Sequence, residues 1–172
     1  QKQGILTMPI TREGNWIVYG MADSGKDELI NSLVYSCITT YSPAELNMYL
    51  LDFGSETLRM YRKAPQVGDV VFQNDTDKIV NLIKMISSIM ETRRKTFAEY
   101  GGNYITYCQT SGKVVPNIVV VINGFELFAE NYGDQLLDTL ITITRDCQKY
   151  GIFFVITSSS SNGIRSKLAQ YL

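Results

Sequence analysis

Two kinds of hydrophobic pattern alternate along this chain. Short, mostly apolar runs occupy residues 16–19, 46–51, 67–72, 118–122 and 152–157. Such runs are typical of strands that are buried on both faces, as in a parallel sheet. Between them, apolar residues recur every three or four positions, as expected for helices that cover a sheet. The alternation predicts an α/β fold with a mainly parallel sheet and helices on both of its faces.

The periodic stretches predict helices over residues 26–39, 76–100 and 135–149, and a final helix that begins near Asn162. Asp75 or Thr76 can cap the longest helix, and Gly101-Gly102 ends it. Other segments are expected to be less regular: an edge strand or arm over residues 5–13, a basic stretch over 54–68, and a loop at Tyr104 and Tyr107. A length of 172 residues suits a single domain, in which residues 1–13 serve as an edge arm or interdomain linker.

The first strand is followed directly by Gly20-Met21-Ala22-Asp23-Ser24-Gly25-Lys26-Asp27. This stretch matches the phosphate loop G-x-x-x-x-G-K-[ST] at every position except the last, and a helical pattern follows it. The glycines let backbone N–H groups turn toward a phosphate chain, and the helix dipole and the Lys26 ammonium add positive charge. The motif and its context predict a P-loop NTPase fold.

The departure at Asp27 concerns the metal. The last position of the motif normally carries a hydroxyl that ligates Mg²⁺, whereas Asp27 places a carboxylate beside the phosphates. We therefore expect ATP to be a weak or vestigial ligand of residues 20–27, with a doubtful role for Mg²⁺ and no metal site of the protein's own.

The strand at residues 118–122 raises the same question. An intact site carries an aspartate where Asn123 stands and, in many ATPases, a glutamate where Gly124 stands. Glu126 is predicted to be a solvated carboxylate. Asp52, which ends another strand, either belongs to the ligand-binding edge of the sheet or caps a loop turn. Because the departures fall on metal and water positions, we expect a domain with weak or no catalysis and assign no catalytic residue.

Composition narrows the possible functions further. The chain has no histidine, which excludes catalysis by histidine and histidine metal sites. Its formal charge of −1 gives no electrostatic footprint for tight nucleic-acid binding. Cys37, Cys108 and Cys147 are predicted to be buried thiols in a reducing compartment. No apolar run approaches the roughly 20 residues of a membrane span, so we predict a soluble, cytosolic segment.

Several segments together resemble the FtsK/SpoIIIE-type translocase ATPases, a resemblance that implies the RecA/FtsK-like form of the P-loop NTPase fold. They are the loop at residues 20–26, the strand end at 50–54, the helix at 86–98, the strand at 118–125, and the tail from Ile156 to Ser161 with Arg165, Leu168 and Leu172. The degenerate loop and the Asn123-Gly124 ending look most like the last of the tandem ATPase domains in EssC-type proteins of type VII secretion. Where the DNA motors carry Gln-Arg-Pro, this chain has Ser158-Ser159-Ser160.

The resemblance implies a cytoplasmic domain of a membrane-anchored motor, whose partners are secreted protein substrates and sister ATPase domains of the same polypeptide rather than nucleic acid. The family fold usually continues with further strands, so its C-terminal part is expected to be missing after Leu172, and residues 1–4 look like the start of an excised piece. Two other hypotheses stay open. An active DNA translocase would need an acidic pair after Ile122 and a basic surface, and a small-molecule phosphotransferase would need an arginine-rich lid.

Overall fold

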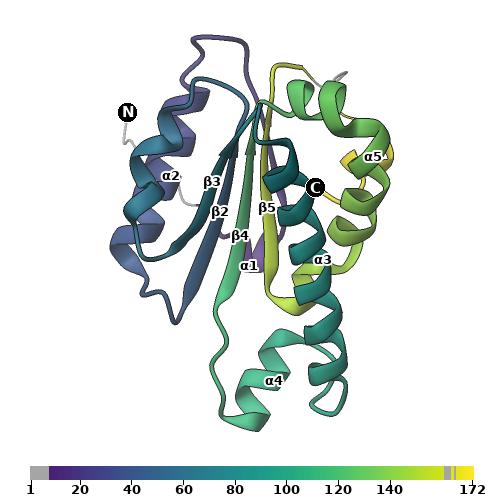
Figure 1. Ribbon diagram of the computed structural model, residues 1–172. Coiled ribbons are helices and arrows are strands. Elements are labelled where there is room, and N and C mark those ends of the chain that lie inside the picture. The colour runs from purple at the N-terminus through teal and green to yellow at the C-terminus, as the bar shows by residue number, and fades with distance from the viewer. Residues whose placement is uncertain (1–7, 161–163, 165) are drawn as a thin grey trace, which may run out of the picture.

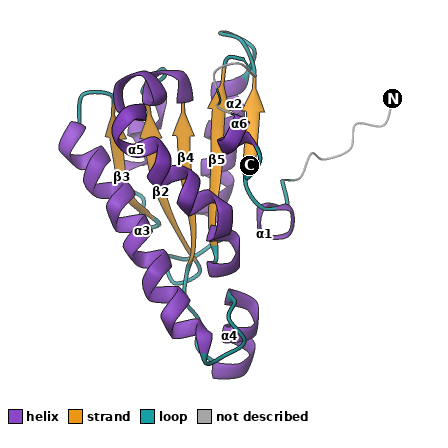
Figure 2. Ribbon diagram, turned by 90° about the vertical axis from the view of Figure 1, so that its right-hand side faces the viewer, coloured by secondary structure: helices purple, strands orange, loops and turns teal. Residues whose placement is uncertain are grey.

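The computed structural model describes residues 8–160, 164 and 166–172, and its centre is a sheet of five parallel strands. The strands are β1 (Trp16–Tyr19), β2 (Leu46–Asp52), β3 (Val67–Phe72), β4 (Asn117–Asn123) and β5 (Ile152–Ser158). Their order across the sheet is β1-β5-β4-β2-β3, and every neighbouring pair is parallel. The arrowheads in Figure 2 all point the same way. The five predicted strands and the predicted fold class are confirmed.

Helices cover both faces of the sheet (Figure 1). One face carries α2 (Lys26–Thr40), the short α1 (Ile10–Glu13) and the 3-10 helix η1 (Thr57–Lys63), whose buried side chains share one apolar cluster. The other face carries α3 (Thr76–Ala98), α5 (Phe125–Asp146) and the short α6 (Ser166–Ala169). The helix α4 (Tyr104–Ser111) and the 3-10 helix η2 (Cys147–Tyr150) lie toward the amino ends of the strands (Figure 2).

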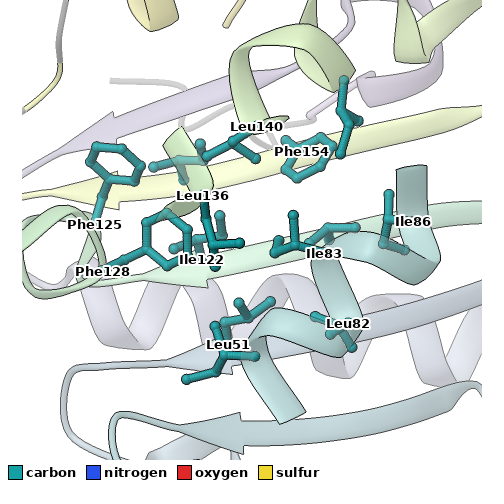
Figure 3. Close-up of a cluster of buried hydrophobic side chains, with 14 of the residues drawn as sticks. Leu51, Leu82, Ile83, Ile86, Ile122, Phe125, Phe128, Leu136, Leu140 and Phe154 are labelled. Carbon is teal, nitrogen blue, oxygen red and sulfur yellow. The ribbon is translucent and has the colours of Figure 1, made fainter. Parts of the chain in front are cut away.

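The core under α3 and α5 is built from side chains of three helices and several strands (Figure 3). Leu51, Ile122 and Phe154 project from the strands and are almost completely buried. The two long helices meet them with regularly spaced apolar side chains: Leu82, Ile83 and Ile86 from α3, and Phe125, Phe128, Leu136 and Leu140 from α5. This packing fixes the start of α5 directly behind the carboxyl end of β4.

Two predictions about helices are wrong: one helix was predicted as a loop, and another begins earlier than predicted. Residues Tyr104–Ser111 form α4 rather than a loop, because the Asn103 side chain caps the helix by accepting a hydrogen bond of 2.9 Å from the Thr106 N–H. The helix predicted from Gln135 begins ten residues earlier, at Phe125. Gly133 lies within this helix.

Three other expectations change. The edge strand or arm predicted for residues 5–13 is wrong for its last part, since Ile10–Glu13 is the helix α1, closed by a 2.8 Å hydrogen bond from Gly14 N to Ile10 O. Residues 5–7 of that stretch and the predicted helix start at Asn162 lie outside the described residues. The basic stretch at 54–68 contains η1 rather than irregular chain.

The parallel arrangement brings all strand ends together at one edge of the sheet. Tyr19 of β1 lies beside Ser158 of β5, and Asp52 of β2 lies beside Asn123 of β4. Ligands of open α/β sheets bind outside this carboxyl edge. The phosphate loop and the Asn123-Gly124 segment therefore belong to one candidate site. Within the described residues, no helix combines the length and apolar character needed to cross a membrane.

Candidate nucleotide site

The loop between β1 and α2 has the backbone shape of a phosphate cradle. Gly20 donates its N–H to Ser158 O at 3.0 Å, which anchors the loop to β5. Asp23 and Gly25 have positive φ angles of 58° and 85°, which turn the chain back toward the start of α2. A Cβ on Gly20 would lie 2.4 Å from Ser24 Oγ, so glycine is required by the close approach. The loop is exposed from residue 21 to residue 25.

Lys26 is positioned by this loop. It is the first residue of α2, and its Nζ donates a hydrogen bond of 2.9 Å to Gly20 O, six residues earlier. The ammonium group therefore lies across the mouth of the loop, where it can meet an anion that the loop N–H groups bind. The geometry fits a phosphate group at residues 20–26.

The last motif residue, Asp27, faces the opposite side of the site. Its Oδ1 accepts a hydrogen bond of 3.1 Å from Asn123 Nδ2, and the same nitrogen donates at 3.1 Å to Asp52 Oδ1. One amide group thus bridges two carboxylates that are 25 residues apart in the sequence. The predicted site residues Asp27 and Asn123 are brought into direct contact, with Asp52 as a third member.

Asp52 serves both of the roles that the sequence left open. Its side chain is 1% exposed and lies at the carboxyl edge of the sheet. Its Oδ1 also accepts a hydrogen bond from Gly54 N, and its Oδ2 accepts one from Leu58 N, each at 3.1 Å. The carboxylate therefore caps the turn between β2 and η1 while it contacts Asn123.

Thr157, near the end of β5, determines which way the Asn123 amide points. The hydroxyl accepts a 2.9 Å hydrogen bond from Gly124 N and donates one of 2.7 Å to Asn123 Oδ1. The opposite orientation of the amide would place Oδ1 against two carboxylate oxygens, which is repulsive. Nδ2 therefore faces Asp27 and Asp52, and Asn123 is 2% exposed with its hydrogen-bonding groups satisfied.

Gly124 has a positive φ of 83°, which favours glycine. A Cβ at this position would lie 3.2 Å from the carbonyl carbon of Phe53 and 3.4 Å from Gly54 N. Both neighbours are backbone atoms and cannot rotate away. A side chain at this position would therefore be strained by the backbone angle and would press on the turn after β2.

The prediction that Glu126 is a solvated carboxylate is wrong. Its carboxylate accepts hydrogen bonds from Ser158 Oγ, from Ser159 N and, at 2.8 Å, from Ser159 Oγ. Partial burial raises the pKa of Glu126, but the hydrogen bonds from the two serines outweigh it, so that the pKa lies below the usual value. Glu126 holds the segment after β5, which is the neighbour of the phosphate loop.

The donors at this edge fit a phosphate better than they fit Mg²⁺. Magnesium takes oxygen ligands in octahedral geometry. Here the group between the Asp27 and Asp52 carboxylates is the amide nitrogen of Asn123, which carries hydrogens and does not coordinate a metal. Across the described ranges, no cluster of three or more His, Cys, Asp or Glu side chains is arranged to hold a metal ion. The loop backbone and Lys26 remain suited to a nucleotide phosphate.

The cysteines are free and lie away from this edge. Burial raises the pKa of Cys37 to about 11 and that of Cys147 to about 12, which leaves both thiols protonated and unreactive. Cys108 is half-buried rather than buried.

The contributions of Thr157 and Glu126 were missed in the sequence. Thr157 is a polar residue at the end of an otherwise apolar run, a signal that could have placed it beside Asn123 if the strand order were known. The partners of Glu126 are more than 30 residues away in the chain, so no local pattern identifies them.

Comparison with known proteins agrees with this geometry. The model of the FtsK/SpoIIIE family matches residues 5–171. The ESX secretion system protein EccC of Geobacillus thermodenitrificans is 34% identical over 161 residues, which make up 93% of this chain and 11% of that protein. The chain thus spans about a tenth of the length of the curated relatives that it matches.

Solved structures give the same result. The cytoplasmic domain of EssC superimposes with a TM-score of 0.86 at 32% identity, over 94% of this chain and 32% of that one. EccC of Thermomonospora curvata (ATPases 2 and 3), solved in complex with a signal sequence peptide, superimposes with a TM-score of 0.84 at 25% identity, over 92% of this chain and 30% of that one. The chain belongs to the FtsK/SpoIIIE family, and the relatives that it matches are the EssC and EccC ATPases of type VII secretion.

Proposed function

We propose that this chain is a degenerate ATPase domain of a membrane-anchored type VII secretion motor, with impaired or absent ATP hydrolysis. The observation that carries this proposal is the amide bridge from Asn123 to Asp27 and Asp52, which stands where an active site would hold Mg²⁺. Without a metal at this position, the charge that develops on the transferred phosphoryl group lacks its main stabilising partner.

A second feature supports impaired hydrolysis. Water attack on a phosphate needs a residue that orients or polarises the water. Gly124 has no side chain for this role, and the backbone at Phe53 lies only 3.2 Å from the position that a Cβ would take. Glu126, the next carboxylate along the chain, is engaged by Ser158 and Ser159.

We propose that nucleotide is retained as a weak ligand of residues 20–27. Gly20, Gly25 and Lys26 supply the shape and charge for phosphate, whereas Asp27 adds a negative charge at the start of α2. A negative charge there opposes phosphate binding, so ATP would bind more weakly than at an intact loop. ATP in this role stabilises the domain or signals to its neighbours rather than driving a cycle.

The known relatives support a proposal about the partners of this chain. One EccC structure contains a signal sequence peptide, which supports a role for this chain in recognising secreted protein substrates. Another relative is described by its ATPases 2 and 3, which supports sister ATPase domains in the same polypeptide, on the cytoplasmic side of the membrane. We propose that residues 1–172 form one such domain. The formal charge of −1 supports protein rather than nucleic-acid partners.

Titration with fluorescent ATP, followed by a hydrolysis assay, tests this function. We expect weak binding that Lys26→Ala reduces by at least about tenfold, because the loop loses its charge-assisted contact to phosphate. Lys113→Ala, which removes an exposed lysine outside the loop, is the matched control and should bind as the unmodified chain does. Phosphate release should equal the background for all three proteins.

A turnover of about one per second or more, lost in Lys26→Ala, would overturn the proposal, since that is the ordinary range for an active enzyme. Stimulation of that turnover by double-stranded DNA would favour a DNA translocase instead. Loss of binding with no turnover would leave the degenerate assignment in place.

A further inference from the structure

The carboxylates of Asp27 and Asp52 form an acidic pair at the site edge, with the amide group of Asn123 between them. Asp27 Oδ1 and Asp52 Oδ1 each lie 3.1 Å from the same nitrogen, Asn123 Nδ2. Two carboxylates held this close raise each other's free energy unless a positive group or hydrogen-bond donors lie between them. The cost is largest for Asp52, which is 1% exposed.

The described part of the chain offers no cationic side chain for this task. Its ion pairs join Arg59 to Glu56, Arg94 to Glu91, and Arg145 and Lys149 to Asp146, and none involves Asp27 or Asp52. Lys26, the neighbouring residue in the chain, donates its Nζ to Gly20 O instead. The donors at the acidic pair are the Asn123 amide and the backbone N–H groups of Gly54 and Leu58.

The hydroxyl group of Thr157 fixes the orientation of the Asn123 amide. Thr157 donates to Asn123 Oδ1 and receives the Gly124 N–H, so both amide hydrogens stay directed at the two carboxylates. Gly54 permits this approach, because a Cβ there would lie 2.9 Å from Asn123 Nδ2. The arrangement joins four elements: the start of α2, the turn after β2, and the ends of β4 and β5.

We propose that Asn123 takes the place of a divalent cation at this edge and makes the site independent of metal. Its two N–H groups bridge Asp27 and Asp52, as a metal ion bridges acidic ligands. The bridge ties the phosphate loop to the turn after β2 whether or not magnesium is present. This inference deepens the proposed function and rests on it for the identity of the loop as a nucleotide site.

Replacing the Asn123 amide by a carboxyl group tests whether the amide takes the place of a divalent cation. Asn123→Asp is nearly isosteric and puts three carboxyl groups, those of Asp27, Asp52 and the new side chain, around one point. In EDTA the variant is expected to melt about 10 °C lower than the unmodified chain, because a buried like charge replaces two hydrogen bonds. Millimolar Mg²⁺ or Mn²⁺ should restore at least half of that loss, because the three carboxylates form a new metal site.

Two controls accompany the measurement. Asn117→Asp makes the same chemical change at the other end of β4, and its Tm should stay within about 2 °C of the unmodified chain with and without metal. The double variant Asp27→Asn/Asn123→Asp keeps the original number of carboxylates and exchanges the donor and the acceptor. It should regain at least half of the lost Tm in EDTA, and it keeps the test valid if Asn123→Asp alone does not fold.

The outcomes separate the inference from the proposed function. A rise in Tm with Mg²⁺ in the unmodified chain, comparable to that of Asn123→Asp, would show that the site already holds a metal and would overturn the inference. The inference is also overturned if Asn123→Asp shows no metal response, or if the double variant melts no higher in EDTA than Asn123→Asp. None of these results depends on ATP hydrolysis, which tests the proposed function by itself.

Discussion

The two halves of the candidate site compare differently with the motif of an intact P-loop ATPase. The phosphate loop at residues 20–26 keeps its glycines, its positive φ angles and its lysine. The facing edge, formed by Asp52, Asn123 and Gly124, lacks the acidic pair of an active ATPase and holds a closed hydrogen-bond network instead. The first half is exposed and the second is almost completely buried.

The comparison separates shape from chemistry. The motif residues of the loop also maintain its backbone, since Gly20 lies close to Ser24 and Gly25 is the N-cap of α2. At the other edge, hydrogen bonds stand where an intact site carries its acidic residues. We infer that the buried half now contributes mainly to stability and the exposed half mainly to binding, which predicts very different responses to substitution.

The largest effect is expected at Gly124. Gly124→Ala should lower the free energy of unfolding by about 2 kcal/mol, because a left-handed backbone and a contact with Phe53 both oppose a Cβ. Gly124→Glu should cost more and should not restore hydrolysis. Urea denaturation measures both. Gly133→Ala is the matched control: it lies in α5 with open space around its Cβ position and should stabilise by about 0.5 kcal/mol.

A stable, hydrolysing Gly124→Glu variant would contradict this account of the buried half. It would mean that the turn at Phe53 and Gly54 yields readily, and that the lost glutamate alone explains any inactivity.

The second effect compares the two halves directly. Asp52→Asn should cost about 1.5 kcal/mol, because one of its three donors, Gly54 N, Leu58 N or Asn123 Nδ2, would then face an N–H group in a buried site. Ser24→Ala, in the exposed half, should change stability by less than about 0.5 kcal/mol. Equal costs in thermal or chemical denaturation would remove the distinction between the halves.

These two halves also differ in how far the sequence could predict them. The phosphate loop is a local motif, in which eight consecutive residues between a strand and a helix carry the shape and the charge. Its position, the five strands and the long helix α3 all follow from short-range patterns, and the structure contains them. Asn123 and Gly124 could be recognised as departures for the same reason.

The contacts of Asn123 with Asp27 and Asp52 could not be predicted from the sequence. The contact between Asp27 and Asn123 spans 96 residues, and that between Asp52 and Asn123 spans 71, so both depend on strand order and register. Local signals were also misread at two helices. Residues 104–111 were predicted as a loop although Asn103 caps α4. The predicted start at Gln135 left out the part of α5 that carries the buried Phe128 and Tyr132.

The smallest effect concerns Glu126, which joins the two halves by holding Ser158 and Ser159 next to the phosphate loop. Its pKa is lowered in the folded chain, so its contribution to stability is present above the unfolded pKa of about 4.3 and is lost as the pH falls through the lower folded value. Glu126 is only partly buried, so solvent screens the interaction and the contribution should stay below about 1 kcal/mol. Denaturation of Glu126→Gln and of the unmodified chain between about pH 3 and pH 7 measures it. The two stability curves should converge at the acidic end and separate toward neutral pH.

Glu130→Gln, an exposed neighbour on α5, is the control and should follow the unmodified chain throughout. Curves for Glu126→Gln that stay parallel to those of the unmodified chain would show that the serine contacts do not depend on the charge. The two halves would then be joined through β5 and through the hydrogen bond between Asn123 and Asp27.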